Sequence, residues 1–198
     1  MSVGLVSSNK ILINGFITSG GQKMSKSLGN VLNPMDFISK YSADALRYFI
    51  ARELSQAEDS DVTEERFREA YNANLANGLG NLVSRVLKMA VTNNVSLSNV
   101  EGLKFKKSEA LEKFEIQKAA NVIWESIREL DGFIQKEEPF KKIKTDPASA
   151  KRDIAQLLAG VYEIALDLQP FMPATAEKIL SAFAGGVVKE VGALFPRK

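Results

Sequence analysis

The feature that most constrains the fold is the recurrence of apolar residues at steps of three and four in four stretches after residue 62. This spacing places the apolar side chains on one side of a helix, so each stretch predicts an amphipathic helix. The predicted helices run from Thr63 to Asn94, from Ser108 to Glu138, from Asp146 to Leu168 and from Pro173 to Phe183. Four such helices without an internal repeat predict an antiparallel helical bundle.

Residues 1–60 have a different character, because short apolar stretches alternate with turn and capping residues. Local signals assign an element to each stretch. The predicted elements are a strand or hairpin over residues 10–18 that turns at Asn14-Gly15, a helix from Pro34 to Tyr41, a helix over residues 43–54 capped by Ser42, and a polar linker over residues 55–61. The predicted fold class is therefore mainly α, with an antiparallel helical bundle over residues 61–198 preceded by a small α/β unit over residues 1–60.

The composition is that of an ordinary globular protein, with 45% hydrophobic and 25% charged residues. The formal net charge is only +2, so any contact with nucleic acid must depend on the local placement of side chains. The chain has no cysteine and no histidine, which argues against disulfides and against a structural zinc site. No apolar run has the length of a membrane span and no signal peptide is evident, so we expect a cytoplasmic protein that does not contact membranes.

The run Lys23-Met24-Ser25-Lys26-Ser27-Leu28-Gly29-Asn30 follows two glycines and carries two lysines and two hydroxyls close together. One interpretation is a solvated polar turn between a hairpin and a helix. The other is a phosphate clamp, because two ammonium groups on a tight loop can stabilise the charge that collects on phosphate oxygens during phosphate chemistry. The run alone leaves both interpretations open.

Together with Val31 and the later run Asp44-Ala45-Leu46-Arg47, this segment resembles the signature loop of class I aminoacyl-tRNA synthetases. The resemblance implies that Lys23 and Lys26 are catalytic residues that contact the phosphates of ATP. It also implies that Ser25 and Ser27 belong to the ATP-binding loop, which would close while the aminoacyl adenylate forms. ATP would be a substrate held mainly by a part of the enzyme that precedes these residues, with Mg²⁺ as a further requirement of the full enzyme and no zinc in this chain.

A second run, Tyr71 to Arg85, places asparagines and glycines in the middle of the first predicted bundle helix, although both are poor helix formers. Asn77, Asn81 and Arg85 are spaced four apart, so they share one side of the helix, roughly 130° round from the apolar stripe. A plain solvent face, or buried asparagines that fix the helix register, would account for the pattern. Amides that pair with base edges and an arginine that contacts bases or phosphate would account for it too.

The asparagine-rich run resembles the anticodon-binding helix of methionyl-tRNA synthetases, and by this resemblance Asn77, Asn81 and Arg85 read a CAU anticodon. Many of these synthetases carry proline-tryptophan where this chain has Pro139-Phe140, with the indole stacked on an anticodon base. The resemblance thus adds Pro139 and Phe140 to the anticodon-binding set. A phenyl ring can still stack on a base, a contact that contributes about 1–3 kcal/mol, but packing of Phe140 in the core is an equal alternative.

The resemblance extends over nearly the whole chain and implies the C-terminal part of a methionine–tRNA ligase, whose partners are the anticodon stem-loop of tRNA(Met), ATP and methionine. The histidine motif that class I synthetases use for ATP is absent, so we expect the chain alone neither to form methionyl-adenylate nor to charge tRNA. A strand separated from its sheet leaves backbone groups unpaired, and we therefore expect disorder or intermolecular pairing in residues 1–30. The alternatives are part of another class I synthetase, such as the valine or leucine enzyme, and a stand-alone RNA-binding or scaffolding helical protein.

Overall fold

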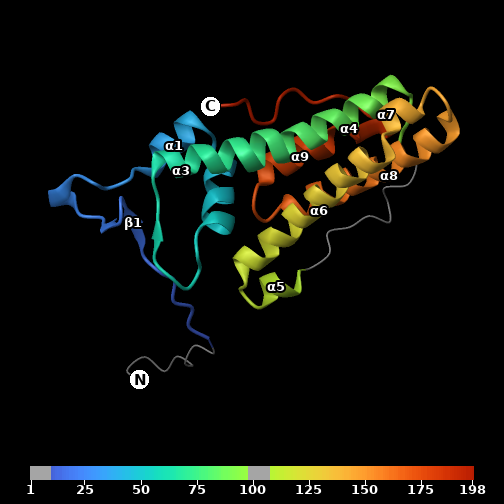
Figure 1. Cartoon of the computed structure of the whole chain (residues 1–198). Coiled ribbons are helices and arrows are strands. Elements are labelled where there is room, and N and C mark those ends of the chain that lie inside the picture. Colours follow the sequence, from blue (N-terminus) through green and yellow to red (C-terminus); the bar gives the residue numbers. More distant parts are fainter. Residues whose placement is uncertain (1–9, 98–107) are drawn as a thin grey trace.

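The first described element is a small three-stranded sheet at one end of the molecule (Figure 1). The computed structural model describes residues 10–97 and 108–198. Strand β1 (Ile17–Ser19) lies between the other two, antiparallel to β2 (Gln22–Lys23) and parallel to β3 (Ser60–Asp61). β1 therefore has a partner on both sides, and the expectation of unpaired backbone in residues 1–30 was wrong for this strand. Residues 1–9, on which the same expectation fell, lie outside the described part.

The predicted turn at Asn14-Gly15 was wrong, because residues 10–16 form no strand and the hairpin turns at Gly20-Gly21 instead. Both turn glycines have positive φ, 63° and 72°, which favours glycine. Gly15 serves a different purpose. A Cβ built on it would lie 2.1 Å from the Glu58 carbonyl oxygen, so only glycine fits where these two segments meet. The prediction of a linker over residues 55–61 was also incomplete, because this segment contains β3, which pairs with β1 as the third strand of the sheet.

The two short helices before the bundle are close to their predictions. Helix α1 (Pro34–Lys40) is capped by Asn33, which accepts a hydrogen bond from the Met35 backbone N–H at 3.1 Å. Helix α2 (Ala43–Tyr48) is capped by Ser42 through the Ala45 N–H, also at 3.1 Å. The second prediction ran as one helix to residue 54, whereas the chain continues from α2 as the π-helical segment η2 (Phe49–Glu53).

The first bundle stretch forms one long helical rod, as predicted (Figure 1). Thr63 caps it by accepting from the Arg66 N–H at 3.1 Å. The rod has three parts, α3 (Glu64–Ala70), the π-helical segment η3 (Tyr71–Gly80) and α4 (Asn81–Thr92). η3 coincides with the asparagine-rich run. The polar residues 93–106, predicted as a connector between the first two bundle helices, fall partly on residues 98–107, which lie outside the described part.

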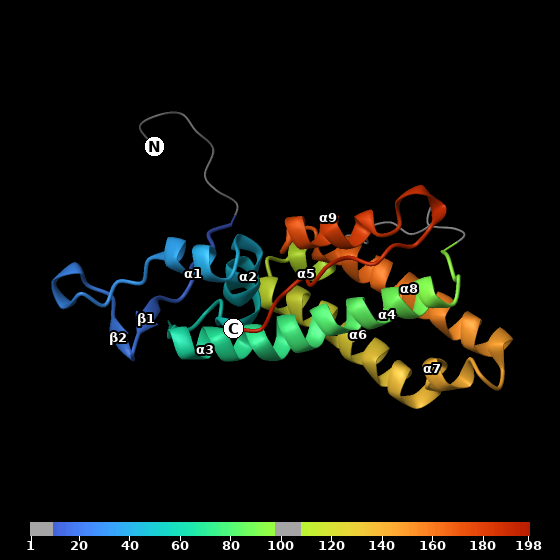
Figure 2. The same ribbon diagram turned by 90° about the horizontal axis from the view of Figure 1, so that it is seen from above.

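The second bundle stretch was predicted as a single helix and is interrupted. It consists of α5 (Glu109–Glu112) and α6 (Ile116–Glu137), and the chain turns between them at Phe114, which has a φ of 61°. The remaining described helical elements are α7 (Pro139–Lys142), α8 (Pro147–Leu168), α9 (Pro173–Ser181) and the one-turn segments η1 (Lys26–Leu28) and η4 (Ala184–Gly186). α8 runs back antiparallel to α6 and packs against α4, α6 and α9 (Figures 1 and 2). The mainly α bundle preceded by a small sheet is confirmed. None of the described helices is long and apolar enough to cross a membrane.

The hydrophobic core is continuous from the N-terminal unit into the bundle. Tyr41 and Phe49 pack their rings against Phe67 of the rod, with centroids 4.7 Å away in each case. Trp124, the single tryptophan of the chain, is buried in α6 with its ring 4.7 Å from that of Tyr48. The division of the chain at residue 60 stays a prediction.

Asp44 and Arg47 tie α2 to the turn between α8 and α9. The buried Asp44 carboxylate accepts a hydrogen bond from the backbone N–H of Thr175, in the first turn of α9, at 2.6 Å. Arg47 donates to the carbonyls of Phe171 at 2.8 Å and Pro170 at 2.7 Å. The Asp-Ala-Leu-Arg run thus has a structural role in this chain, because it holds the N-terminal unit against the bundle.

Candidate functional site

The lysine loop lies at the end of the molecule farthest from α7 and projects from the sheet (Figure 1). Asn30 gives the loop its shape, because its side chain accepts from the Ser25 N–H at 2.8 Å and donates to the Lys23 carbonyl at 3.3 Å. The hydroxyls of Ser25 and Ser27 are 2.8 Å apart. The loop is therefore a folded turn that carries its two lysines and two hydroxyls within a few residues of one another.

Lys23 and Lys26 are both exposed, Lys23 at the end of β2 and Lys26 at the start of η1. The Lys23 ammonium lies over the ring of Phe16, 5.2 Å from its centroid. Neither lysine forms an ion pair with a carboxylate within residues 10–97 and 108–198. Two exposed ammonium groups without such a partner, on lysines three positions apart in one loop, are suited to bind an anion such as a polyphosphate.

Asp61 of β3 fixes the hairpin turn that precedes the loop. Its carboxylate accepts from the Gly21 N–H at 2.8 Å and from the Thr18 hydroxyl at 2.9 Å. These hydrogen bonds, first that from Gly21 and then that from Thr18, lower the pKa of Asp61 below its ordinary value. The charged carboxylate is the form that holds the turn.

We expect this turn to loosen in acid. Because the folded pKa of Asp61 is lowered, its stabilising effect is complete above the ordinary carboxyl pKa of about 3.9 and is lost as the pH falls through the lowered value. The Gly21 amide signal, followed by NMR from about pH 6 to about pH 2, should titrate with a midpoint below about 3.9. Asp61→Asn should abolish that titration, and a midpoint at or above the ordinary value in the unchanged protein would contradict the assignment.

Asn77 and Asn81 are exposed on the rod, so the alternative of buried asparagines that fix the helix register does not describe them. The Asn77 side-chain oxygen accepts two hydrogen bonds from the Arg197 guanidinium, at 2.9 and 2.6 Å. Both asparagines line a groove of about 380 Å³ between the rod and the C-terminal segment. The side-chain oxygen of Asn77 is therefore engaged, whereas the Asn81 side chain borders the groove without a hydrogen bond to another described residue.

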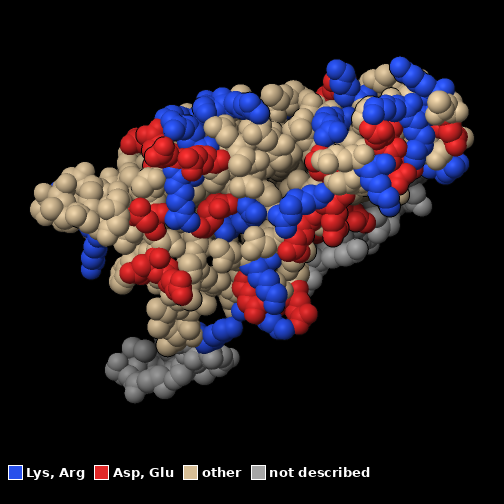
Figure 3. Space-filling view, viewed as in Figure 1, with Lys and Arg blue, Asp and Glu red and all other residues tan. Residues whose placement is uncertain are grey.

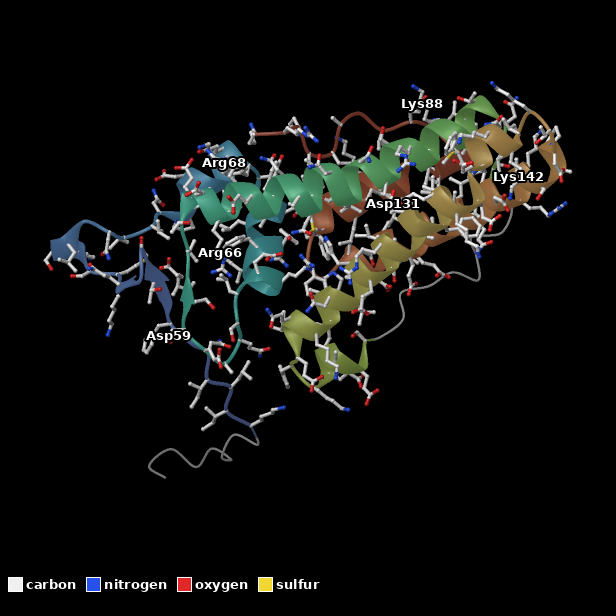
Figure 4. All side chains as sticks on the ribbon, in the orientation of Figure 1. Asp59, Arg66, Arg68, Lys88, Asp131 and Lys142 are labelled. Carbon is white, nitrogen blue, oxygen red and sulfur yellow. The ribbon has the colours of Figure 1, made fainter. Side chains whose placement is uncertain are left out.

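Arg85 lies one helical turn beyond Asn81, with 36% of its side chain exposed. Its guanidinium forms an ion pair with Asp131 of α6, at 2.7 Å (Figure 4 labels Asp131). Gln135 donates to the other oxygen of the same carboxylate at 2.8 Å. This ion pair holds the side chain in one orientation. Because an arginine carries five N–H donors, donors remain for another partner.

Pro139 and Phe140 lie at the start of α7, where α6 ends. Pro139 is buried, whereas Phe140 is 45% exposed and has the Lys141 ammonium 5.8 Å from its ring centroid. The structure thus places the Phe140 ring at the surface, and the alternative of a core position does not describe it. Lys142 is bound to Glu137 and Asp153, at 2.8 and 2.7 Å, and these hydrogen bonds raise its pKa.

The structure brings the predicted residues into two separate places. Lys23, Ser25, Lys26 and Ser27 lie on the loop beside the sheet, whereas Asn77, Asn81, Arg85, Pro139 and Phe140 lie on the bundle. The face seen in Figure 3 mixes basic and acidic side chains over the bundle, consistent with the small net charge. Recognition of an anionic partner on that face must depend on individual side chains.

Sequence reasoning missed Asp131, Gln135 and Arg197, which contact predicted residues directly. Arg197 is 120 positions from Asn77 along the chain and Asp131 is 46 from Arg85. Helical periodicity relates only residues within one helix, so it carries no signal for such contacts.

Two family models match the chain in succession. Residues 1–87 match the model of class I tRNA synthetases (M), and residues 90–190 match the anticodon-binding domain of methionyl tRNA ligase. Among curated proteins, the methionine–tRNA ligase of Rhizobium meliloti (strain 1021) is 34% identical over 93% of this chain, and that of Fusobacterium nucleatum is 35% identical over 96%. Neither the family models nor these relatives point to the valine or leucine enzyme.

A solved structure of Mycobacterium tuberculosis methionyl-tRNA synthetase in complex with methionyl-adenylate has a TM-score of 0.77 and 25% identity over 93% of this chain. The chain spans only 39% and 32% of the lengths of the two curated relatives and 43% of this structure. The matches cover the sheet, the lysine loop and the bundle together. The chain therefore belongs to the methionyl-tRNA ligase family.

Proposed function

We propose that this chain supplies anticodon recognition to a methionine–tRNA ligase and contributes the lysine loop that contacts ATP. The observation that carries the proposal is the row of the exposed Asn77 and Asn81 and the half-buried Arg85 on one rod, with the arginine held by Asp131. Asparagine is unfavourable in the middle of a helix, and a face that contacts only solvent gives no reason for it there. A binding partner that contacts the amides would give such a reason.

The row offers the groups that read unpaired bases. The Asn81 amide can donate to and accept from the Watson–Crick edge of a base, and the NH₂ group of Asn77 can donate to one, since its oxygen is bound by Arg197. The remaining N–H groups of Arg85 can contact a base or a phosphate. α6 continues for about 9 Å beyond Asp131 before α7 begins, and the exposed ring of Phe140 follows there. We infer that the CAU anticodon lies across the row and that one splayed base stacks on Phe140.

The lysine loop would act on the other substrate. In a complete ligase, Lys26 and Lys23 would stabilise the charge that develops on the phosphates of ATP when methionine attacks, with Ser25 and Ser27 as hydrogen-bond donors. Magnesium would accompany ATP in that enzyme, although the described residues contain no cluster of acidic side chains suited to hold it. The chain spans only 39% and 32% of the lengths of its two relatives, and we expect no pyrophosphate exchange from it alone. Exchange above background in a clean preparation would contradict this expectation.

Arg85→Ala tests the anticodon role. We expect the variant to bind a CAU anticodon stem-loop about tenfold more weakly, because a hydrogen bond to a charged group contributes about 1.5–3 kcal/mol. Binding of the 198-residue chain to CAU loops and to loops with altered anticodons, measured at one fixed salt concentration, gives both affinity and discrimination.

Arg128→Ala is the matched control, since Arg128 is an exposed arginine of α6 whose nearest carboxylate is 4.0 Å away. It should change the affinity less than twofold. If Arg85→Ala leaves both the affinity and the preference for CAU unchanged, the row on the rod does not read the anticodon.

A further inference from the structure

The C-terminal segment of the chain, residues 187–198, lies along the rod and is here called the strap (Figure 2). Phe195 is buried with its ring edge-on to that of Tyr71, at a centroid distance of 6.0 Å. The Tyr71 hydroxyl donates to the Pro196 carbonyl at 3.0 Å. The strap is therefore a packed part of the fold at the level of η3.

Gly80 lies where the strap meets the rod. A Cβ at this position would lie 3.6 Å from the Phe195 ring and 3.0 Å from the Leu75 carbonyl oxygen, five residues back in the π-helical segment. A glycine in the middle of a helix costs about 1 kcal/mol relative to alanine, and the closeness of the Leu75 carbonyl gives a physical reason for it here, whereas the Phe195 ring is at an ordinary contact distance.

Beyond Phe195, the strap binds the amides of η3. Lys198 exchanges two backbone hydrogen bonds with the Asn72 side chain, at 2.7 and 3.0 Å. Arg197 directs its Nε and one Nη nitrogen to the side-chain oxygen of Asn77, at 2.9 and 2.6 Å. Because this oxygen accepts both bonds, the Asn77 amide has one fixed orientation, and its NH₂ group is left as a donor for another partner.

The groove beside this contact has the volume and the chemistry of a small ligand site. It measures about 380 Å³, within the range of about 300–1,000 Å³ that is usual for such sites. Its polar lining comes from Asn77, Asn81, Ser84 and Arg197, and Phe195 forms part of its apolar wall. Rod and strap both contribute to it.

We propose that the groove is a subsite for one unpaired nucleotide of RNA, and that Arg197 completes it. This proposal rests on the anticodon-binding function proposed above. Arg197 has two tasks, since it holds the Asn77 amide with the NH₂ group as the available donor and it places a positive charge beside the groove. Donors and a cation suit the carbonyl edge of a base and its phosphate, and Asn81 can both donate and accept.

The experiment compares Arg197→Gln and Arg197→Lys with the unchanged chain in binding CAU and altered-anticodon stem-loops over a range of salt. Arg197→Gln removes the charge and the guanidinium fork, and should weaken CAU binding about tenfold. It should also reduce the slope of log K against log salt by about 0.7, the share of one phosphate in single-stranded nucleic acid. Arg197→Lys keeps the charge, so it should retain the salt slope while losing part of the preference for CAU.

Lys189→Gln is the matched control, since it removes one exposed charge from the same strap away from the groove. It should leave the affinity within about twofold of that of the unchanged chain and should leave the salt slope unchanged. Thermal unfolding of each variant shows whether the bundle is intact, and Arg197→Lys keeps the test informative if the glutamine variant unfolds.

Arg85→Ala serves as the reference that separates the two proposals. If it weakens binding while both Arg197 variants bind as the unchanged chain does, the nucleotide subsite is wrong and the anticodon function stands. Tighter binding by Arg197→Gln would mean that the strap covers the RNA-binding face, which also overturns the subsite. If Arg85→Ala and both Arg197 variants leave binding unchanged, both proposals fail.

Discussion

Asp44→Ala is expected to lower the free energy of unfolding by about 3 kcal/mol, because it removes a buried hydrogen bond made by a charged group. Asp44 is 6% exposed, and its carboxylate accepts from the Thr175 N–H at 2.6 Å. Met172, the residue at the cap position of α9, makes no side-chain hydrogen bond to this helix. A side chain from α2 therefore caps α9, and its negative charge lies at the positive end of the helix dipole.

Urea unfolding measures this effect, and the transition midpoint should fall without a change in slope. Asp44→Asn keeps an oxygen acceptor and should be destabilised less than Asp44→Ala. Asp36→Ala is the control, because Asp36 is an exposed first-turn aspartate of α1 whose carboxylate accepts one hydrogen bond, from the Asn33 amide at 3.3 Å, and its loss should cost less than about 1 kcal/mol. A loss of stability in Asp44→Ala no larger than in Asp36→Ala would show that the contact with α9 does not hold the bundle.

Arg47→Ala should destabilise the same turn from its other side. Its guanidinium binds the carbonyls of Pro170 and Phe171, just before α9. Since Asp44 and Arg47 secure one turn, the double substitution should cost less than the sum of the two single ones.

Capping residues and apolar periodicity correctly predicted those helices whose formation depends on residues close together in the sequence. The caps Asn33, Ser42 and Thr63 each accept the backbone N–H that their residue type predicts, because capping depends on neighbours within three residues. The apolar periodicity predicted the long helices for the same reason. It missed the break at Phe114, since a single residue with positive φ leaves the pattern of apolar side chains almost intact.

The hairpin shows where local signals become ambiguous. Asn14-Gly15 and Gly20-Gly21 are both turn signals, and the choice depends on the carbonyl of Glu58, which meets Gly15. The candidate site shows the same limit. Spacing within the helix was enough to place Asn77, Asn81 and Arg85 on one side of the rod. Their partners come from α6 and the strap, and the spacing within one helix does not predict residues from other segments.

Lys26→Ala is expected to have the largest effect on activity, slowing methionine-dependent pyrophosphate exchange about 10²- to 10³-fold in a complete ligase that carries this chain. Removal of one preorganised donor from developing negative charge typically costs about 2.7–4 kcal/mol of transition-state stabilisation. Lys26 is exposed on η1, in a loop shaped by Asn30, and forms no ion pair within the described residues. Because the charge develops in the transition state, kcat should fall much more than the KM for ATP rises.

Lys151→Ala, which removes an exposed lysine from α8, should leave exchange within about twofold, since surface substitutions away from a site have small effects. Lys26→Ala should bind the CAU stem-loop as the unchanged protein does, because the loop and the rod lie in separate parts of the molecule (Figure 1). Lys26→Arg keeps the charge but not the compact ammonium, so it should recover only part of the rate. An exchange rate in Lys26→Ala close to that of Lys151→Ala would remove Lys26 from the chemistry and leave the loop as the solvated turn that its composition alone allows.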